Sequence, residues 1–391
     1  MTQTPKGNTS PAAAFELAAL ATAAVEDLEI HGVRPGTGQG TKGISTWAAA
    51  SHGDEWQIYC PDTPLSESDR DKMLRAQAVL TRARLRGDIP FNVPVPRSIV
   101  NRRDGRSVFI FPALGGREAT GDTFASETLF ATSLATALGA LHSVDPKRVE
   151  ATGVPTQSAV DHHDQLESLL RSHWTAIPSD LRTRWNNALR DETLWQYRPC
   201  IIHGTLEPAD VQVAGGGAVV AIKGFESIQV GDPAQDAGWL LYYADLAFLD
   251  RFETTYAQQV EHKDLHLMTR ARLLAELETL RWYDAATKTS DRQWREEGRA
   301  ALREMDQELR GTSLVDAPQE VVHIEFDAHE EPLLRLKETS QRVVSGAGED
   351  KGVPTPTPQW LPDVHEEPLS PPTAATTVHP APREYPHGSW D

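Results

Sequence analysis

Two neighbouring stretches contain the residues whose types and spacing suggest a reactive site. CIIHGTLEPADVQV (200–213) and AVVAIKGFESIQVGDPAQD (218–236) read as a strand, a loop and a hairpin. Asp210 and Glu226 supply carboxylates, which are good ligands for a hard cation such as magnesium. Thr205 offers only a hydroxyl, which is not a base near neutral pH. The two stretches therefore raise the question of whether this loop and hairpin still carry out chemistry.

The hairpin also predicts which way its side chains point. In an extended strand neighbouring side chains face opposite ways, so Lys223 faces away from a cleft that Gly224 faces. Glu226 then lies on the Gly224 face, where its carboxylate is placed either for a metal or for an ion pair. Asp232 precedes Pro233, an order typical of a helix N-cap followed by the first helical residue.

Residues 13–114 combine helical and β patterns that would form a small sheet module. Ala-rich helical periodicity extends from about Ala13 to Leu28. Short alternating runs predict strands, and Ser and Asp before a periodic segment with Gly after it predict a helix. The expected order after the first helix is strands in HGVRP, ISTWAAASH and EWQIYCP, a helix in LSESDRDKMLRAQAVLTRARLRG, and two strands around RRDGR.

The remainder of the folded region is expected to be mainly helical. GGREATGD (115–122) reads as a hinge, and 123–310 reads as a helical lobe with one β-interruption at 200–228. Apolar periodicity begins at TFASETLFATSLATALGALHSVD. Further helices are predicted at 157–176, 179–191, 233–248, 251–285 with a break, and 290–309.

Both ends of the chain are predicted to be disordered. Residues 1–12 are polar, and 311–391 contain 12 of the 27 prolines and 14 acidic against 5 basic side chains. Such a composition buries too little apolar surface to offset the entropy of ordering. Two short apolar islands in this acidic tail could serve as a docking segment for a protein partner, but incidental hydrophobic residues in a solvated tail explain them more simply.

Composition limits the classes of partner. The formal net charge of −18 over 391 residues disfavours nucleic acid, whose binding depends on Lys and Arg contacts to phosphates. We expect no membrane span, because uninterrupted apolar runs are short, and a cytoplasmic location. Cys60 and Cys200 are expected to be buried rather than paired or metal-binding, and His162 and His163 to lie on the surface.

Four short pieces together resemble the aminoglycoside and macrolide phosphotransferase family, which has a protein-kinase-like fold. They are LHSVD (141–145), the HG of IIHG with LEPADVQV after it, the hairpin GGGAVVAIKGF, and GDPAQDAGWLL (231–241). The resemblance extends over about 14–308. It implies an α+β, two-lobed fold with a small β-sheet N-lobe and a mainly helical C-lobe.

The family's catalytic positions are altered in this sequence. The resemblance places Thr205 where the family has the Asp that accepts the substrate proton, and Asp210 where it has a metal-binding Asn. It places Gly224, beside Phe225, where the family has the principal metal-binding Asp. The resemblance also implies that His203 shapes the turn of the loop through hydrogen bonds to backbone groups.

The same resemblance assigns roles to residues outside this loop. Asp236 is implied to brace the loop through backbone N–H groups. Tyr59 and Gln77 fall where the family has a basic residue and a Glu that grip the ATP phosphates. GTGQGTKG (36–43) offers backbone N–H groups and Lys42 to a phosphate, but it lacks a Walker A ending and reads more simply as a flexible loop.

These replacements favour a pseudokinase that binds a small molecule, a nucleotide without turnover, or a protein, with the ligand in the cleft between the lobes. The alternative is an active ATP-dependent small-molecule phosphotransferase with magnesium held by Asp210 and Glu226. A third reading is a structural adaptor whose cleft is closed. The need for magnesium in nucleotide binding distinguishes the first two.

Overall fold

An antiparallel sheet organises the first part of the chain in the computed structural model, which describes residues 9–36 and 43–315. All of these residues belong to one compact unit. The strand order is β1-β2-β3-β5-β4, as predicted in number and position. Tyr59 pairs with Ser45 on one side and Phe109 on the other. The strands are β1 (Ile30–Pro35), β2 (Gly43–Ala50), β3 (Glu55–Pro61), β4 (Ser98–Asn101) and β5 (Ser107–Pro112).

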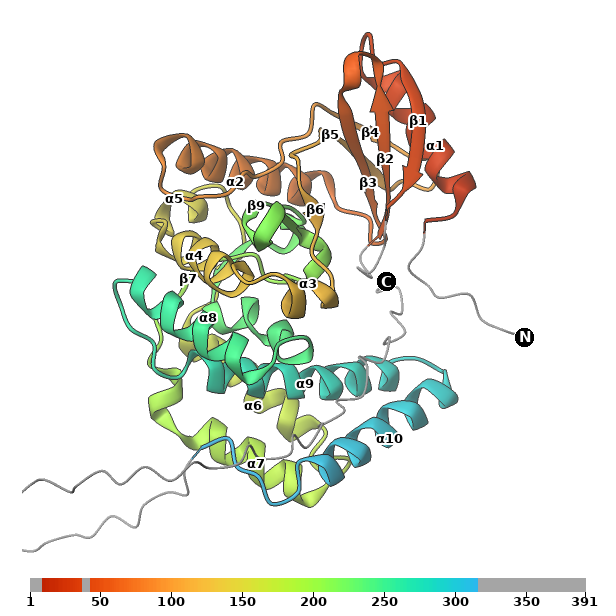
Figure 1. Ribbon diagram of the computed structural model, residues 1–391. Helices are drawn as coiled ribbons and strands as arrows, with labels where there is room; N and C mark the ends of the chain where they lie inside the picture. Colours follow the sequence, from red (N-terminus) through yellow and green to blue (C-terminus); the bar gives the residue numbers. More distant parts are fainter. Residues whose placement is uncertain (1–8, 37–42, 316–391) are drawn as a thin grey trace, which may run out of the picture. The chain divides into compact units, whose positions relative to one another are not determined.

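Helix α1 (Pro11–Ala24) packs against the sheet through a shared apolar cluster (Figure 1). It begins two residues before the predicted start, because the Ser10 hydroxyl accepts a hydrogen bond from the Ala13 N–H at 3.2 Å. It ends before the predicted Leu28, because Val25 has an extended backbone. Val25 and Leu28 are nevertheless buried in the cluster, so their hydrophobicity indicates the core rather than the helix.

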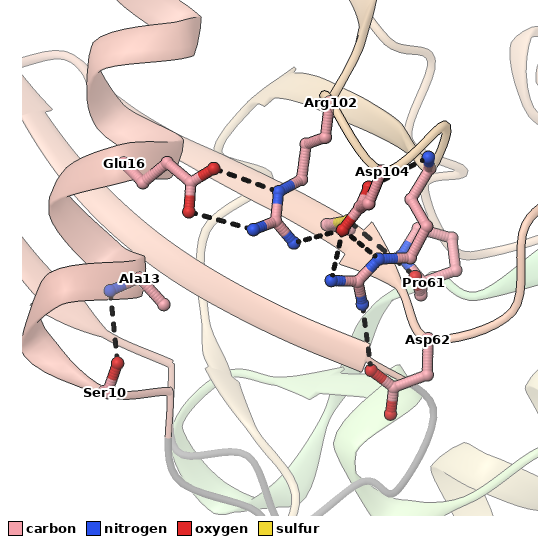
Figure 2. A network of polar contacts seen from close by, with 9 residues as sticks. Ser10, Ala13, Glu16, Pro61, Asp62, Arg102 and Asp104 are labelled. Carbon is pink, nitrogen blue, oxygen red and sulfur yellow. Dashed lines mark hydrogen bonds and ion pairs between the residues drawn. The ribbon is translucent and has the colours of Figure 1, made fainter. Parts of the chain in front are cut away.

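A charged network at the β4–β5 turn fastens α1 to the edge of the sheet (Figure 2). The Arg102 guanidinium donates to both carboxylate oxygens of Glu16, at 3.1 and 2.9 Å, and lies 3.2 Å from Asp104. Arg106 also contacts Asp104 at 2.9 Å and reaches Asp62, just beyond β3, at 3.4 Å. The bidentate Arg102–Glu16 geometry makes this pair more specific than an ordinary surface ion pair.

Helix α2 (Glu67–Arg86) connects the sheet to the helical part of the chain. Ser66 caps its start, and Gly87 ends it in the left-handed conformation with φ 83°. Met73 packs with aromatic residues of β5, whereas Leu80 belongs to the large core that the later helices form. One helix therefore takes part in both apolar cores, and the two predicted lobes share packing through it.

Most of the later helices occur where helical periodicity was predicted, with differences at their ends, but the short helix at Lys147–Glu150 was not predicted. The predicted helix that begins near residue 123 is two helices, α3 and α4, separated at 127–129. Helices α4 and α8 lie side by side (Figure 1). The helices are α3 (Gly121–Ser126), α4 (Phe130–Ser143), α5 (Lys147–Glu150), α6 (Ala159–Ser172), α7 (Ser179–Arg190), α8 (Leu246–Gln259), α9 (Leu267–Thr287) and α10 (Arg292–Glu308).

Short strands interrupt the helices at 200–231, close to the predicted β-interruption. Strands β6, β8 and β9 form one small sheet, and β10 pairs with β7. Strand β6 lies inside the predicted hinge segment, 115–122, and pairs with β8, so part of that segment is held in a sheet. The strands are β6 (Arg117–Glu118), β7 (Cys200–Ile202), β8 (Val211–Val213), β9 (Val219–Ile222) and β10 (Gln229–Gly231).

The prediction of an α-helix over 233–248 is wrong. The segment forms two 3₁₀ helices, η6 (Pro233–Asp236) and η7 (Gly238–Tyr242), before α8 begins. Asp232 caps η6 by accepting a hydrogen bond from the Ala234 N–H at 2.9 Å. Ala237, with φ −111° and ψ −16°, ends the first of these 3₁₀ helices and precedes the second, so the apolar pattern continues without one continuous α-helix.

The prediction that His162 lies on the surface is also wrong. His162 is buried, and its Nδ1 lies 3.1 Å from the Tyr197 hydroxyl and 3.6 Å from Asp232. Burial lowers the pKa of His162 to about 4, so the ring is neutral at physiological pH. Cys60 and Cys200 are buried and unpaired, as predicted.

The helices of the described ranges include none with the length and apolar character of a membrane span. The predictions for residues 1–8, 37–42 and 316–391, which include Lys42 and the acidic tail, fall outside the described residues.

Candidate functional site

A pocket forms where β3, α2 and the β9–β10 connection meet. Its volume is about 50 Å³, well below the roughly 300–1,000 Å³ of pockets that bury drug-sized ligands. Five residues singled out from the sequence line it: Tyr59, Gln77, Asp210, Gly224 and Glu226. The structure therefore brings together residues that are up to 167 positions apart in the sequence.

Asp236 holds the loop that follows β7. Its carboxylate accepts hydrogen bonds from the N–H groups of His203, at 2.7 Å, and Gly204, at 2.8 Å. His142 Nε2 lies 3.2 Å from the same carboxylate. Burial of Asp236 favours the neutral acid, but the hydrogen bond and charge of His142, the charge of His203 and the Gly204 N–H outweigh it and lower the Asp236 pKa. An ionised carboxylate thus fixes the loop backbone.

His203 joins this loop to the hairpin. Its Nε2 lies 2.7 Å from the Lys223 carbonyl oxygen, and its ring packs against Phe225 with centroids 4.8 Å apart. Gly204 has φ 91°, and a Cβ there would lie 2.4 Å from the Ser227 carbonyl oxygen, so the close approach of the two segments requires glycine. Neither residue lines the pocket.

Asp232 belongs to a separate buried ion network. Arg270 donates to both of its oxygens, at 3.0 and 2.9 Å, and also donates to Asp264 at 3.0 Å. Asp232 is fully buried and Arg270 is 1% exposed. Asp232 therefore connects η6 to α9 and does not face the pocket.

Asp210 lines the pocket and also caps the short 3₁₀ helix η3 (Pro208–Asp210). Its Oδ2 accepts a hydrogen bond from the Glu207 N–H at 3.2 Å, and its carbonyl oxygen accepts one from the Lys223 N–H at 2.9 Å. One carboxylate oxygen is thus already committed to the local backbone.

Gly224 has a left-handed backbone, with φ 82°. A Cβ at this position would lie 2.4 Å from Asp210 Oδ1 and 2.9 Å from its Cγ. Real Cβ contacts are not this short, so a side chain at 224 requires Asp210 to move. The resemblance assigns Gly224 and Asp210 to metal binding. In this structure the Asp210 carboxylate occupies the space that a side chain at position 224 would need.

The prediction that Lys223 faces away from the cleft is wrong. Lys223 lines the pocket, and its ammonium lies 2.6 Å from the Glu118 carboxylate, with both side chains largely buried. Strand β9 ends at Ile222 and Gly224 is left-handed, so alternation of side chains does not continue past the strand.

Tyr59 and Gln77 occupy the pocket wall on the sheet and on α2. Burial raises the pKa of Tyr59 well above its ordinary value, and the charges of Glu226, Asp210 and Glu207 raise it further. The phenol is therefore neutral at physiological pH. Gln77 is buried and neutral, so the two positions supply no ion pair to grip a phosphate.

Thr205 is exposed and is not among the residues that line the pocket. Among the described residues there is no group of three or more His, Cys, Asp or Glu side chains arranged to hold a metal. Asp210 and Glu226 share the pocket wall, but they supply only two carboxylates, one of them partly used by the backbone.

Three further residues that line the pocket were missed by sequence reasoning: Gln57, Glu118 and Glu207. Gln57 lies two residues before Tyr59 on β3, so the period of the strand could have placed it on the same face. Glu207 was visible two residues after Thr205 in the loop. Glu118 gave no signal, because only the pairing of β6 with β8 brings it to the hairpin.

A family model described as "Phosphotransferase enzyme family" matches residues 60–274. No curated protein matched the sequence. The matched range includes the loop after β7, the hairpin and Gln77, and it ends within α9.

Solved structures show the same fold at low sequence identity. The macrolide 2'-phosphotransferase MphH from Brachybacterium faecium, an apoenzyme, is 23% identical with a TM-score of 0.62, over 75% of this chain and 98% of its own. The GDP complex of wild-type aminoglycoside 2'-phosphotransferase-IIIa is 18% identical with a TM-score of 0.58, over 75% and 97%. Macrolide 2'-phosphotransferase type I is 19% identical with a TM-score of 0.56, over 77% and 99%. These likenesses confirm the two-lobed, kinase-like fold class predicted from the sequence.

Proposed function

The chain belongs to the phosphotransferase enzyme family, and from this premise we propose that it is a pseudokinase: a member that does not transfer phosphate and uses its cleft to bind a ligand or a protein. The observation that supports the proposal most is Gly224. The position assigned to the principal metal-binding carboxylate has no side chain, and Asp210 fills the space that one needs. Without that carboxylate the charge developing on transferring phosphates lacks its main neutralising partner.

Two other features support the same proposal. Thr205 supplies no general base, which is typically worth a factor of about 10²–10⁴ in rate. Tyr59 is a neutral phenol where a cation is needed, and Lys223, the ammonium that lines the pocket, is paired with Glu118.

The experiment that tests this proposal is a coupled assay of ADP formation from ATP and magnesium. The full chain would be incubated with aminoglycoside and macrolide acceptors, because the structural neighbours include phosphotransferases of both classes. We expect no ADP formation above that of a heat-denatured sample. Repeated turnover by the purified chain would refute the proposal.

An active enzyme remains the second candidate, because Asp210 and Glu226 line one pocket. It requires both carboxylates, ATP and magnesium. If turnover appears, Asp210→Ala and Glu226→Gln should each abolish it, because each removes a carboxylate ligand. Full turnover in both variants would exclude this metal site. A protein partner for the acidic tail and a cytoplasmic location stay expectations from the sequence.

A further inference from the structure

Two buried glutamine side chains on the pocket wall have unpaired amide atoms. Gln57 is 7% exposed and Gln77 is 4% exposed, and both line the pocket. Gln57 Nε2 and Gln77 Oε1 form no hydrogen bond with any described residue. Buried polar atoms are rarely left unpaired, because the loss of solvation is then not compensated. The wall therefore offers one donor and one acceptor to an occupant.

The two amides reach the pocket from different elements. Gln57 lies on β3 two residues before Tyr59, so both side chains are on the same face of the sheet. Gln77 lies one helical turn after Met73 on α2, so these two share a face of the helix. Strand and helix thus present a donor and an acceptor to one small space, which a group with a complementary acceptor and donor can bridge.

The wall beside the amides is aromatic and apolar. Phe111 is the cross-strand partner of Gln57, and Phe109 is that of Tyr59. The two phenylalanine rings are stacked, with centroids 6.2 Å apart and 12° between their planes. Met73 belongs to the same apolar cluster. Such a wall favours a flat apolar group, because aromatic rings stack on one another.

The pocket limits the size of the polar group that enters it. Its volume of about 50 Å³ admits a group of a few heavy atoms. Half-buried residues also line it, among them Gly43, Glu207 and Glu226, so the pocket reaches the surface and the rest of a ligand can extend outward. Both glutamine amides are neutral, so a neutral polar group can pair with them without an ionised side chain.

We propose that this pocket binds the primary carboxamide group of a compact, planar, neutral ligand. The carboxamide N–H donates to Gln77 Oε1, and its oxygen accepts from Gln57 Nε2. The planar portion lies against Phe109 and Phe111. A carboxamide matches the wall because it carries a donor and an acceptor side by side in a very small group. This inference rests on the proposed function, because it assigns a ligand class to the cleft of a member that does not transfer phosphate.

The test compares benzamide with acetophenone by calorimetric titration of the full chain. The two molecules share the ring and the carbonyl group, and differ only in that a methyl group replaces the amide nitrogen. We expect benzamide to bind with a Kd in the millimolar range or tighter, and acetophenone at least about tenfold more weakly, because its methyl group leaves Gln77 Oε1 buried and unpaired. Equal binding of the two overturns the inference. Failure of benzamide to bind overturns it as well, since the two amides are then satisfied by water alone.

Two variants locate the carboxamide. Gln77→Leu removes the acceptor, so it should weaken benzamide about tenfold without weakening acetophenone, and the preference for benzamide should disappear. Gln57→Leu removes the donor to the carbonyl oxygen that both molecules carry, so it should weaken both about equally and keep the preference. A preference that survives Gln77→Leu shows that benzamide binds elsewhere, and the inference fails.

Gln212→Leu is the matched control. Gln212 is 2% exposed, and neither of its amide atoms has a hydrogen-bond partner among the described residues, but it does not line the pocket. The change should therefore alter the binding of neither molecule. If Gln212→Leu abolishes the preference for benzamide as Gln77→Leu does, the effect comes from general repacking and the assignment to Gln77 is overturned.

The ADP assay distinguishes failure of this inference from failure of the proposed function. Absence of both benzamide binding and ATP turnover overturns the carboxamide ligand and leaves the pseudokinase proposal intact. Turnover with magnesium and ATP overturns the proposed function, and with it the carboxamide as the ligand of a cleft that does not transfer phosphate.

Discussion

Substitution of Gly224 tests whether the metal position can still accept a carboxylate. Gly224→Asp places a non-glycine residue at φ 82°, which costs about 1–2 kcal/mol. The same change puts a second carboxylate beside Asp210, and two like charges about 4 Å apart repel by about 1 kcal/mol in water and about 4 kcal/mol near a protein surface. We therefore expect a total loss of roughly 2–6 kcal/mol in the free energy of unfolding, the sum of these two costs.

Gly224→Ala is the matched control, because it has the same φ and the same Cβ contact without the charge. Urea unfolding at neutral pH should show Ala destabilised by about 1–2 kcal/mol and Asp by more. The excess for Asp should largely disappear in an Asp210→Asn background, where the charge repulsion is absent. Equal stability of the Asp and Ala variants would refute the reasoning, since it would show that carboxylates at 224 and 210 do not repel each other measurably.

Three further predictions concern the site and its supports. The double variant Thr205→Asp with Gly224→Asp should show no ATP turnover in the coupled assay, because Tyr59 and Gln77 still supply no ion pair to hold the phosphates. Appreciable turnover would show that the N-terminal sheet holds ATP without this ion pair. Arg270→Met should lower the free energy of unfolding by about 3–5 kcal/mol in urea titrations, because it leaves the buried Asp232 carboxylate without its partner; a loss under 1 kcal/mol would contradict the ion network. His162 has a pKa of about 4 in the folded chain against an ordinary 6.5, so the unfolded chain takes up this proton at higher pH. The free energy of unfolding should therefore fall by roughly 3 kcal/mol as the pH drops from 6.5 to 4. His162→Gln should flatten this pH dependence, and an unchanged dependence would exclude His162 as its source.

Strands and capped helices could be predicted because their signals are local. Alternation and turn residues predicted the five-stranded sheet, and Ser66 and Gly87 predicted both ends of α2. The 3₁₀ helices at 233–242 could not be predicted in the same way, because the apolar period resembles that of an α-helix while the turn geometry depends on buried partners.

The composition of the pocket was only partly predictable. Tyr59, Gln77 and Gly224 were singled out because the resemblance to the family assigns roles to their positions, and all three line the pocket. Lys223 was misplaced because the strand ends one residue before it, and Glu118 was missed because its position depends on a pairing between distant segments. The set of residues that line the pocket is therefore a tertiary property of the fold.

The most direct test of the central claim is a calorimetric titration of the full chain with ATP, once with magnesium and once with EDTA. The account predicts that magnesium adds nothing: ATP either fails to bind or binds weakly and equally in both buffers, because no principal carboxylate holds the metal. Binding that requires magnesium would contradict the account and would make Asp210 and Glu226 the ligands of a working site.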